Sequence, residues 1–148
     1  MSSIFATRDE SRGLQAGVEG TVDSAVNWIV NPPDLPEPSG FSHAVVSGRT
    51  VYLAGQIAAG DTLLEQFDGA VSGLMTALAG AGAKPDDLVW LQVFVTDVAE
   101  YRDSRPALAQ VWRKYFGRHY PAMGMFGVTE LFDPEAKVEL MGIAVKQT

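Results

Sequence analysis

The chain has no cysteine among its 148 residues, which excludes disulfides, thiol nucleophiles and thiolate metal sites. It has two histidines, too few for a histidine metal cluster, so we expect no metal and no cofactor. No uninterrupted apolar run approaches the roughly 20 residues that a transmembrane helix needs. The first residues also lack the apolar core of a signal peptide. Together these absences favour a cytoplasmic protein with no membrane partner.

Basic residues are scarce as well. Lys and Arg total 11 against 18 Asp and Glu, so the formal net charge is −7. Phosphate contacts need clustered Lys and Arg, and we therefore expect no nucleic-acid partner. Hydrophobic residues, in contrast, make up 47% of the chain. That share and this length are enough for one domain with a proper core.

The N-terminal segment differs in composition from the rest. Residues 1–25 are glycine-containing and acidic, and we expect an N-terminal arm or an extra edge ribbon there. Residues 26–148 are expected to form a single domain. Val26, Trp28 and Val30 alternate with Asn27 and Ile29 and predict a short strand, which Asn31-Pro32-Pro33 would end.

A hairpin is the clearest local prediction. Residues 43–46 and 51–57 are β-rich and flank Ser47-Gly48-Arg49, a pattern typical of two antiparallel strands joined by a tight turn. Gly55 falls inside the second of these strands. A glycine there usually marks a bulge or a close approach by another group, which makes this end of the hairpin a place to look for a ligand.

The first helix is predicted to start at Asp61 or Thr62, because Thr62 and Glu65 have the spacing of a capping box. Glycines at 80 and 82 indicate its end. Six apolar residues then fall on one helical face and should be buried. They are Leu64, Phe67, Val71, Leu74, Met75 and Leu78.

The second half of the chain continues the pattern. Residues 88–95 are almost wholly apolar and predict a strand covered on both faces. Residues 97–102 read as a turn, followed by a helix from Ser104 to Gly117. Two more strands are expected at 125–128 and 138–145. The predicted fold is α+β, with two helices packed on one face of a mixed six-stranded sheet.

Five stretches carry a resemblance to a known family. They are Asn31-Pro32-Pro33, residues 40–45, residues 51–56, Pro121-Ala122 and Val138-Glu139-Leu140. In this order and spacing they resemble the Rid family, also called YjgF/YER057c/UK114 or, by an older label, endoribonuclease L-PSP. The resemblance implies a chorismate-mutase-like fold and a homotrimer that buries the other sheet face. It also implies small-molecule clefts between subunits, where enamines and imines are hydrolysed to keto acids and ammonia.

The residues that would do this chemistry differ here. Met123 stands where the family has a carboxylate-binding arginine, Met141 where it has a glutamate, and Phe41 where it has a tyrosine. The resemblance therefore implies a cleft that is apolar and uncharged. The alternative is that Met123 and Met141 are ordinary core fillers.

The expected ligand-binding residues follow from these matches. They are Phe41, Gly55, Gln56, Tyr120, Ala122, Met123 and Met141. No catalytic residue is assigned. His119 and Glu130 lie in loops near the expected cleft and are the candidates, although His119 also suits a hydrogen-bonding brace. Glu139 is expected to face away from Met141, so we do not count it as a replacement acid.

Two functions remain open from the sequence, and whether the protein is an enzyme is undecided. The first is a divergent enamine or imine deaminase, a hydrolase acting on a small substrate without the usual carboxylate clamp. The second is a non-catalytic trimer of the same fold that binds a small ligand or regulates a partner. Ribonuclease activity, implied only by the older family label, is opposed by the charge of −7.

Overall fold

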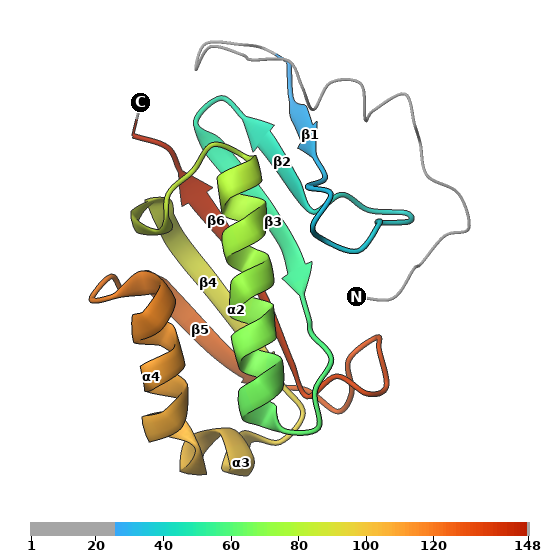
Figure 1. Cartoon of the computed structure of the whole chain (residues 1–148), viewed down its shortest axis with the longest axis vertical. Helices are drawn as coiled ribbons and strands as arrows, with labels where there is room; N and C mark the ends of the chain where they lie inside the picture. Colours follow the sequence, from blue (N-terminus) through green and yellow to red (C-terminus); the bar gives the residue numbers. More distant parts are fainter. Residues whose placement is uncertain (1–25, 148) are drawn as a thin grey trace.

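The computed structural model describes residues 26–147, arranged as one sheet with helices on one side (Figure 1). The N-terminal arm expected at residues 1–25 lies outside the described residues. The strands are β1 (Trp28–Val30), β2 (Ala44–Ser47), β3 (Thr50–Gln56), β4 (Leu88–Val95), β5 (Ala122–Gly127) and β6 (Val138–Val145). The helices are α2 (Leu63–Gly80), the 3₁₀ turn η1 (Pro85–Asp87), α3 (Val98–Asp103) and α4 (Arg105–Phe116).

The sheet is mixed, as predicted. Its strand order is β1-β2-β3-β6-β4-β5, and β4 and β5 run parallel while the other neighbours are antiparallel. A parallel pair needs a crossover connection, which α3 and α4 supply. The predicted hairpin is confirmed: Ser47 pairs with Thr50 across a two-residue turn in which Gly48 has φ +61°.

The start of α2 follows the capping prediction. The Thr62 hydroxyl accepts a bond from the Glu65 N–H at 3.1 Å, and the Glu65 carboxylate accepts one from the Asp61 N–H at 2.9 Å. Gly82, with φ +76°, follows the helix end. One residue of the predicted buried face is wrong, because Leu64 is 40% exposed and Leu63 is buried instead.

The core lies between the sheet and the helices α2 and α4, which cross the same face of the sheet in Figure 1. The strand β4 shows how one-sided this cover is. Leu91, Val93 and Val95 are buried toward the helices, whereas Trp90, Gln92 and Phe94 on the other face are only partly buried. The expectation that both faces of β4 are covered is therefore not met within one chain.

The predicted turn at residues 97–102 is wrong, because α3 forms there. Asp97 caps it by accepting a bond from the Glu100 N–H at 2.9 Å. The following helix, α4, begins at Arg105 with Pro106 in its first turn, as expected, but the Ser104 side chain makes no cap bond. Helix α4 ends at Gly117, whose φ is +61°.

Polar contacts fix α4 and the loop after it. Asp68 of α2 accepts bonds from the Tyr115 hydroxyl at 2.6 Å and the Lys114 ammonium at 2.9 Å. These bonds, the one from Tyr115 first, lower the pKa of the Asp68 carboxyl. The His119 ring bonds the Leu88 carbonyl at 2.7 Å, which ties the loop before β5 to β4. These bonds therefore hold both α4 and the loop between α4 and β5 in place.

No helix within residues 26–147 is long and apolar enough to cross a bilayer.

Candidate ligand site

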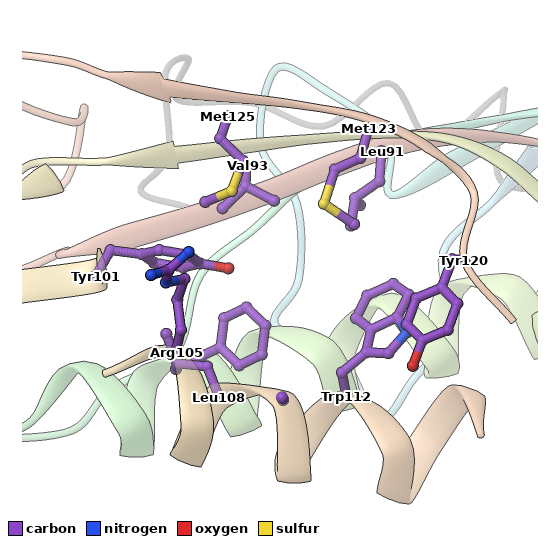
Figure 2. Close-up of a pocket in the computed structure, with 11 residues that line it drawn as sticks. Leu91, Val93, Tyr101, Arg105, Leu108, Trp112, Tyr120, Met123 and Met125 are labelled. Carbon is purple, nitrogen blue, oxygen red and sulfur yellow. The ribbon is translucent and has the colours of Figure 1, made fainter. Parts of the chain in front are cut away.

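A pocket of about 250 Å³ lies between α4 and the parallel pair β4–β5, and we call it the α4–β5 pocket (Figure 2). Most of its lining is aliphatic, aromatic or methionine side chain. The lining residues are Phe67, Leu91, Val93, Tyr101, Arg105, Leu108, Ala109, Trp112, Tyr120, Met123 and Met125.

The secondary structure explains why these residues meet. On α4, Arg105, Leu108, Ala109 and Trp112 are spaced three or four apart and so share one face of the helix. On β5, Met123 and Met125 are two apart, and they pair with Leu91 and Val93 of β4. The small side chain of Ala109 stands between larger neighbours, which leaves room for a cavity.

Polar groups are few and stand toward the ends of the pocket. Figure 2 shows Arg105 and Tyr101 toward one end and Tyr120 toward the other. Burial raises the pKa of Tyr101, so its hydroxyl stays protonated and can donate a hydrogen bond. Tyr120 is 63% exposed and stands at the mouth. The site can therefore hold an apolar group while offering hydrogen-bond donors at both ends.

The expected ligand-binding residues do not form one cluster in a single chain. Tyr120 and Met123 line the α4–β5 pocket. Ala122 is the neighbour of Met123 on β5 and therefore faces the opposite side of the sheet. Met141 pairs with Gln92, the neighbour of Leu91, and so also lies on the face without helices.

The other three expected residues lie at the end of the β2–β3 hairpin. The Gln56 amide donates to the His43 ring at Nδ1 (3.1 Å), and His43 Nε2 donates to the Pro36 carbonyl at 2.6 Å. Phe41 meets the same ring edge-on, with ring centroids 5.4 Å apart. The pKa of His43 is lowered, chiefly by burial, and the neutral ring is the form that fits both bonds. This network is a structural brace.

Gly55 confirms the predicted close approach. The β3–β6 register shifts between Leu53 and Gln56, and a Cβ at Gly55 would overlap the Glu139 side chain. Burial raises the pKa of Glu139. The expectation that Glu139 faces away from Met141 was wrong: the two residues are two apart on β6 and pair with Phe94 and Gln92 on one face.

The two catalytic candidates lie elsewhere. His119 does not line the α4–β5 pocket, and its ring is engaged with the Leu88 carbonyl. Glu130 borders a separate polar hollow beside Thr129 and Lys137. Among residues 26–147 there is no group of three His, Asp or Glu side chains that could hold a metal ion.

Only Tyr120 and Met123 of the eleven lining residues are among the expected ligand-binding residues, and Arg105 is the charged residue among the other nine. The expected uncharged cleft has one cation among the described lining residues, and it comes from α4 rather than from β5. The signal was available in the helical spacing of residues 105, 108, 109 and 112, which places the arginine on the same stripe as the apolar residues.

The comparisons identify the family. Residues 34–146 match the family model described as Endoribonuclease L-PSP. The chain is 32% identical over 126 residues to a Dermatophagoides farinae protein named 2-iminobutanoate/2-iminopropanoate deaminase, covering 79% of this chain and 94% of that one. It is 29% identical over 133 residues to the Drosophila melanogaster RutC family protein UK114, covering 84% and 93%.

Solved structures agree. A Mycobacterium tuberculosis member of the YjgF/YER057c/UK114 family superposes with a TM-score of 0.69 at 29% identity, covering 81% of this chain and 99% of that one. An Entamoeba histolytica protein described as a putative endoribonuclease L-PSP gives 0.70 at 25% identity, covering 81% and 99%. The chain therefore belongs to the endoribonuclease L-PSP family, also called the Rid or YjgF/YER057c/UK114 family.

Proposed function

We propose that this protein is a Rid-type hydrolase of imines and enamines whose substrate carries an apolar side chain. The observation that carries the proposal is the α4–β5 pocket, in which Met123 and Met125 form part of an apolar wall. The similarity to a relative named 2-iminobutanoate/2-iminopropanoate deaminase supports the reaction class. The pocket volume of about 250 Å³ favours a small substrate.

The reaction needs few catalytic groups from the protein. An enamine first takes up a proton at carbon and becomes the imine. Water then adds to the imine carbon, the carbinolamine loses ammonia, and a carbonyl remains. The protonated hydroxyl of Tyr101 can donate to the imine nitrogen, which favours attack by water. The walls hold the reacting carbon in place, and such positioning can supply much of a modest rate enhancement.

The test is imine loss measured directly. Imines are generated in situ by an amino-acid oxidase from alanine and phenylalanine, and by an amine oxidase from phenethylamine. Semicarbazide traps the imine that remains as a semicarbazone, so hydrolysis by the protein lowers the initial rate of semicarbazone formation. We expect the protein to accelerate hydrolysis of the two phenyl-bearing imines. No acceleration with any of the three would remove the hydrolase proposal.

A second candidate function is a non-catalytic trimer that binds a small apolar ligand. It is favoured by the lining of the α4–β5 pocket, which within residues 26–147 includes no carboxylate and no histidine. Under this alternative, apolar carbonyl compounds raise the melting temperature while imine loss stays at the rate in buffer. The two measurements together separate an enzyme from a binding module.

A homotrimer is part of the proposal. The helix-free face of the sheet carries Tyr52, Phe126 and Met141, each at least 36% exposed, and Phe94 stacks on Phe126 with centroids 5.5 Å apart. An apolar sheet face of this kind is stabilised when another subunit covers it. Trimer formation would also bring the residues on this face, including Met141 and Glu139, into contact with another copy.

A further inference from the structure

Arg105 stands on the pocket-facing stripe of α4, one turn before Ala109. Figure 2 shows its side chain rising from the helix toward the strands, beside Tyr101 in that view. It is the one cation among the described residues that line the α4–β5 pocket. Arg105 is exposed, so its guanidinium stands at the solvent edge of the apolar hollow and stays hydrated until a ligand meets it.

The guanidinium is already oriented. Its Nε donates to the Arg102 carbonyl at the end of α3 at 3.1 Å, which restrains the side chain. Its two terminal amino groups have no hydrogen bond or ion pair with any residue in 26–147. A planar fork with free N–H groups matches the two oxygens of a carboxylate, and an arginine held in place loses little freedom on binding one.

We propose that Arg105 is the carboxylate-binding residue of the α4–β5 pocket, and that the ligand is a 2-imino or 2-keto acid with an aromatic or branched apolar side chain. This inference deepens the proposed function and rests on it for the reaction, although the binding site can be tested alone. The carboxylate meets Arg105 at one end, and the apolar group lies against Met123, Met125 and Trp112.

The size of the pocket selects among such acids. An apolar cavity of about 150 Å³ is enough to bind benzene. The α4–β5 pocket, at about 250 Å³, therefore has room for a phenyl ring and the few further atoms of a keto acid. An acid with a methyl side chain would leave most of the apolar wall facing water. Adaptable methionines at 123 and 125 suit side chains of several shapes.

The experiment compares two ligands that differ only in charge. Phenylpyruvate and phenylacetone share the ring and the ketone, but phenylacetone has a methyl group in place of the carboxylate. Calorimetric titration should give wild type at least about tenfold tighter binding of phenylpyruvate, the scale of one charge-assisted contact. Arg105→Gln should lose about tenfold or more for phenylpyruvate and change phenylacetone by less than about twofold.

Three further variants make the result specific. Arg102→Gln removes a neighbouring exposed arginine that does not line the pocket, and it should bind both ligands as wild type does. Arg105→Lys keeps the charge without the fork and should recover part of the phenylpyruvate affinity. Ala109→Phe fills the pocket and should abolish binding of both ligands while the far-ultraviolet circular dichroism stays unchanged.

Several outcomes would overturn the assignment. Equal affinities for the two ligands in wild type would do so, as would equal losses in Arg105→Gln and Arg102→Gln. Unchanged binding in Ala109→Phe would place the ligand elsewhere. Binding through Arg105 without any imine hydrolysis would support this inference and remove the hydrolase. Hydrolysis of the phenylalanine-derived imine with the same KM in Arg105→Gln would keep the hydrolase and remove the inference.

Discussion

Met123 and Met141 lie on opposite faces of one sheet. Met123 pairs with Leu91 of β4 and faces the helices, whereas Met141 pairs with the next residue, Gln92, and faces away from them. The two methionines therefore cannot meet within one chain. Met123 belongs to the α4–β5 pocket, and Met141 belongs to the surface that we propose another subunit covers.

Placing an arginine at residue 123 should change which acids the pocket prefers. In Met123→Arg, the guanidinium would stand on the β5 wall and bind the carboxylate of a short acid. We expect kcat/KM for the alanine-derived imine to rise by about tenfold and that for the phenylalanine-derived imine to fall. Met123→Leu, a substitution of similar volume, should leave the preference as in wild type. An unchanged ratio in Met123→Arg would contradict the placement of this wall.

Assembly should depend on the helix-free face. Phe126 is 42% exposed there, and Phe126→Glu would put a charge into an apolar interface. Sedimentation is expected to give about three times 15.9 kDa for wild type and about 15.9 kDa for the variant. Leu64→Glu, at a similarly exposed position on α2, should keep the wild-type mass. A wild-type protein that sediments as a monomer would dismiss the trimer.

Glu139 should make the protein less stable as the pH rises. Its pKa is raised by burial, so the folded chain keeps this proton to a higher pH than the unfolded chain. The favourable contribution is present below the usual glutamate pKa and is lost as pH rises through the raised value. Glu139→Gln should therefore unfold at a higher denaturant concentration than wild type at pH 8. The difference between the two unfolding midpoints should become smaller toward pH 4. The same difference at both pH values would contradict this.

The hydrogen-bond network of His43 should have the opposite pH dependence, making the protein less stable as the pH falls. Because the pKa of His43 is lowered from 6.5, its contribution to stability is present above about pH 6.5 and is lost as pH falls. His43→Asn keeps an acceptor for Gln56 but loses the bond to Pro36. We expect it to lower the free energy of unfolding by about 1–3 kcal/mol at pH 7.5 and to flatten the decline between pH 7 and 5.5. Urea unfolding at several pH values measures the free energy of unfolding and its decline with pH. If stability declines as steeply in the variant as in wild type, the pH dependence belongs to another group.

Much of the fold could be predicted because its signals are local. The β2–β3 turn needs a glycine at 48, and the bounds of β6 follow a mostly apolar stretch interrupted by Glu139. Helix α3 has a local signal too, Asp97 followed three residues later by Glu100, although the sequence analysis predicts only a turn there. The apolar spacing predicts a buried Leu64, but the structure buries Leu63 instead. The apolar face at the start of a helix can shift by one residue at little cost.

The site was harder to predict than the fold. Which residues share a pocket depends on which strands are neighbours, and the parallel pairing of β4 with β5 brings Leu91 opposite Met123. The sequence of neither strand indicates that β4 and β5 pair. The basic residues of this helix favour a solvated helix face, and Arg105 is exposed; only the packing of α4 shows that it also lines a cavity. Glu139 and Met141 are two apart on β6, so strand alternation places them on one face, and the register agrees.

The most direct test is the ratio of kcat/KM for the phenylalanine-derived imine to that for the alanine-derived imine, measured with the wild-type protein. Burying a phenyl group against the pocket wall favours the larger substrate by about 1.5–3 kcal/mol, which is tenfold or more. We therefore expect a ratio of at least about ten. A ratio of one or below would contradict a pocket built for apolar side chains.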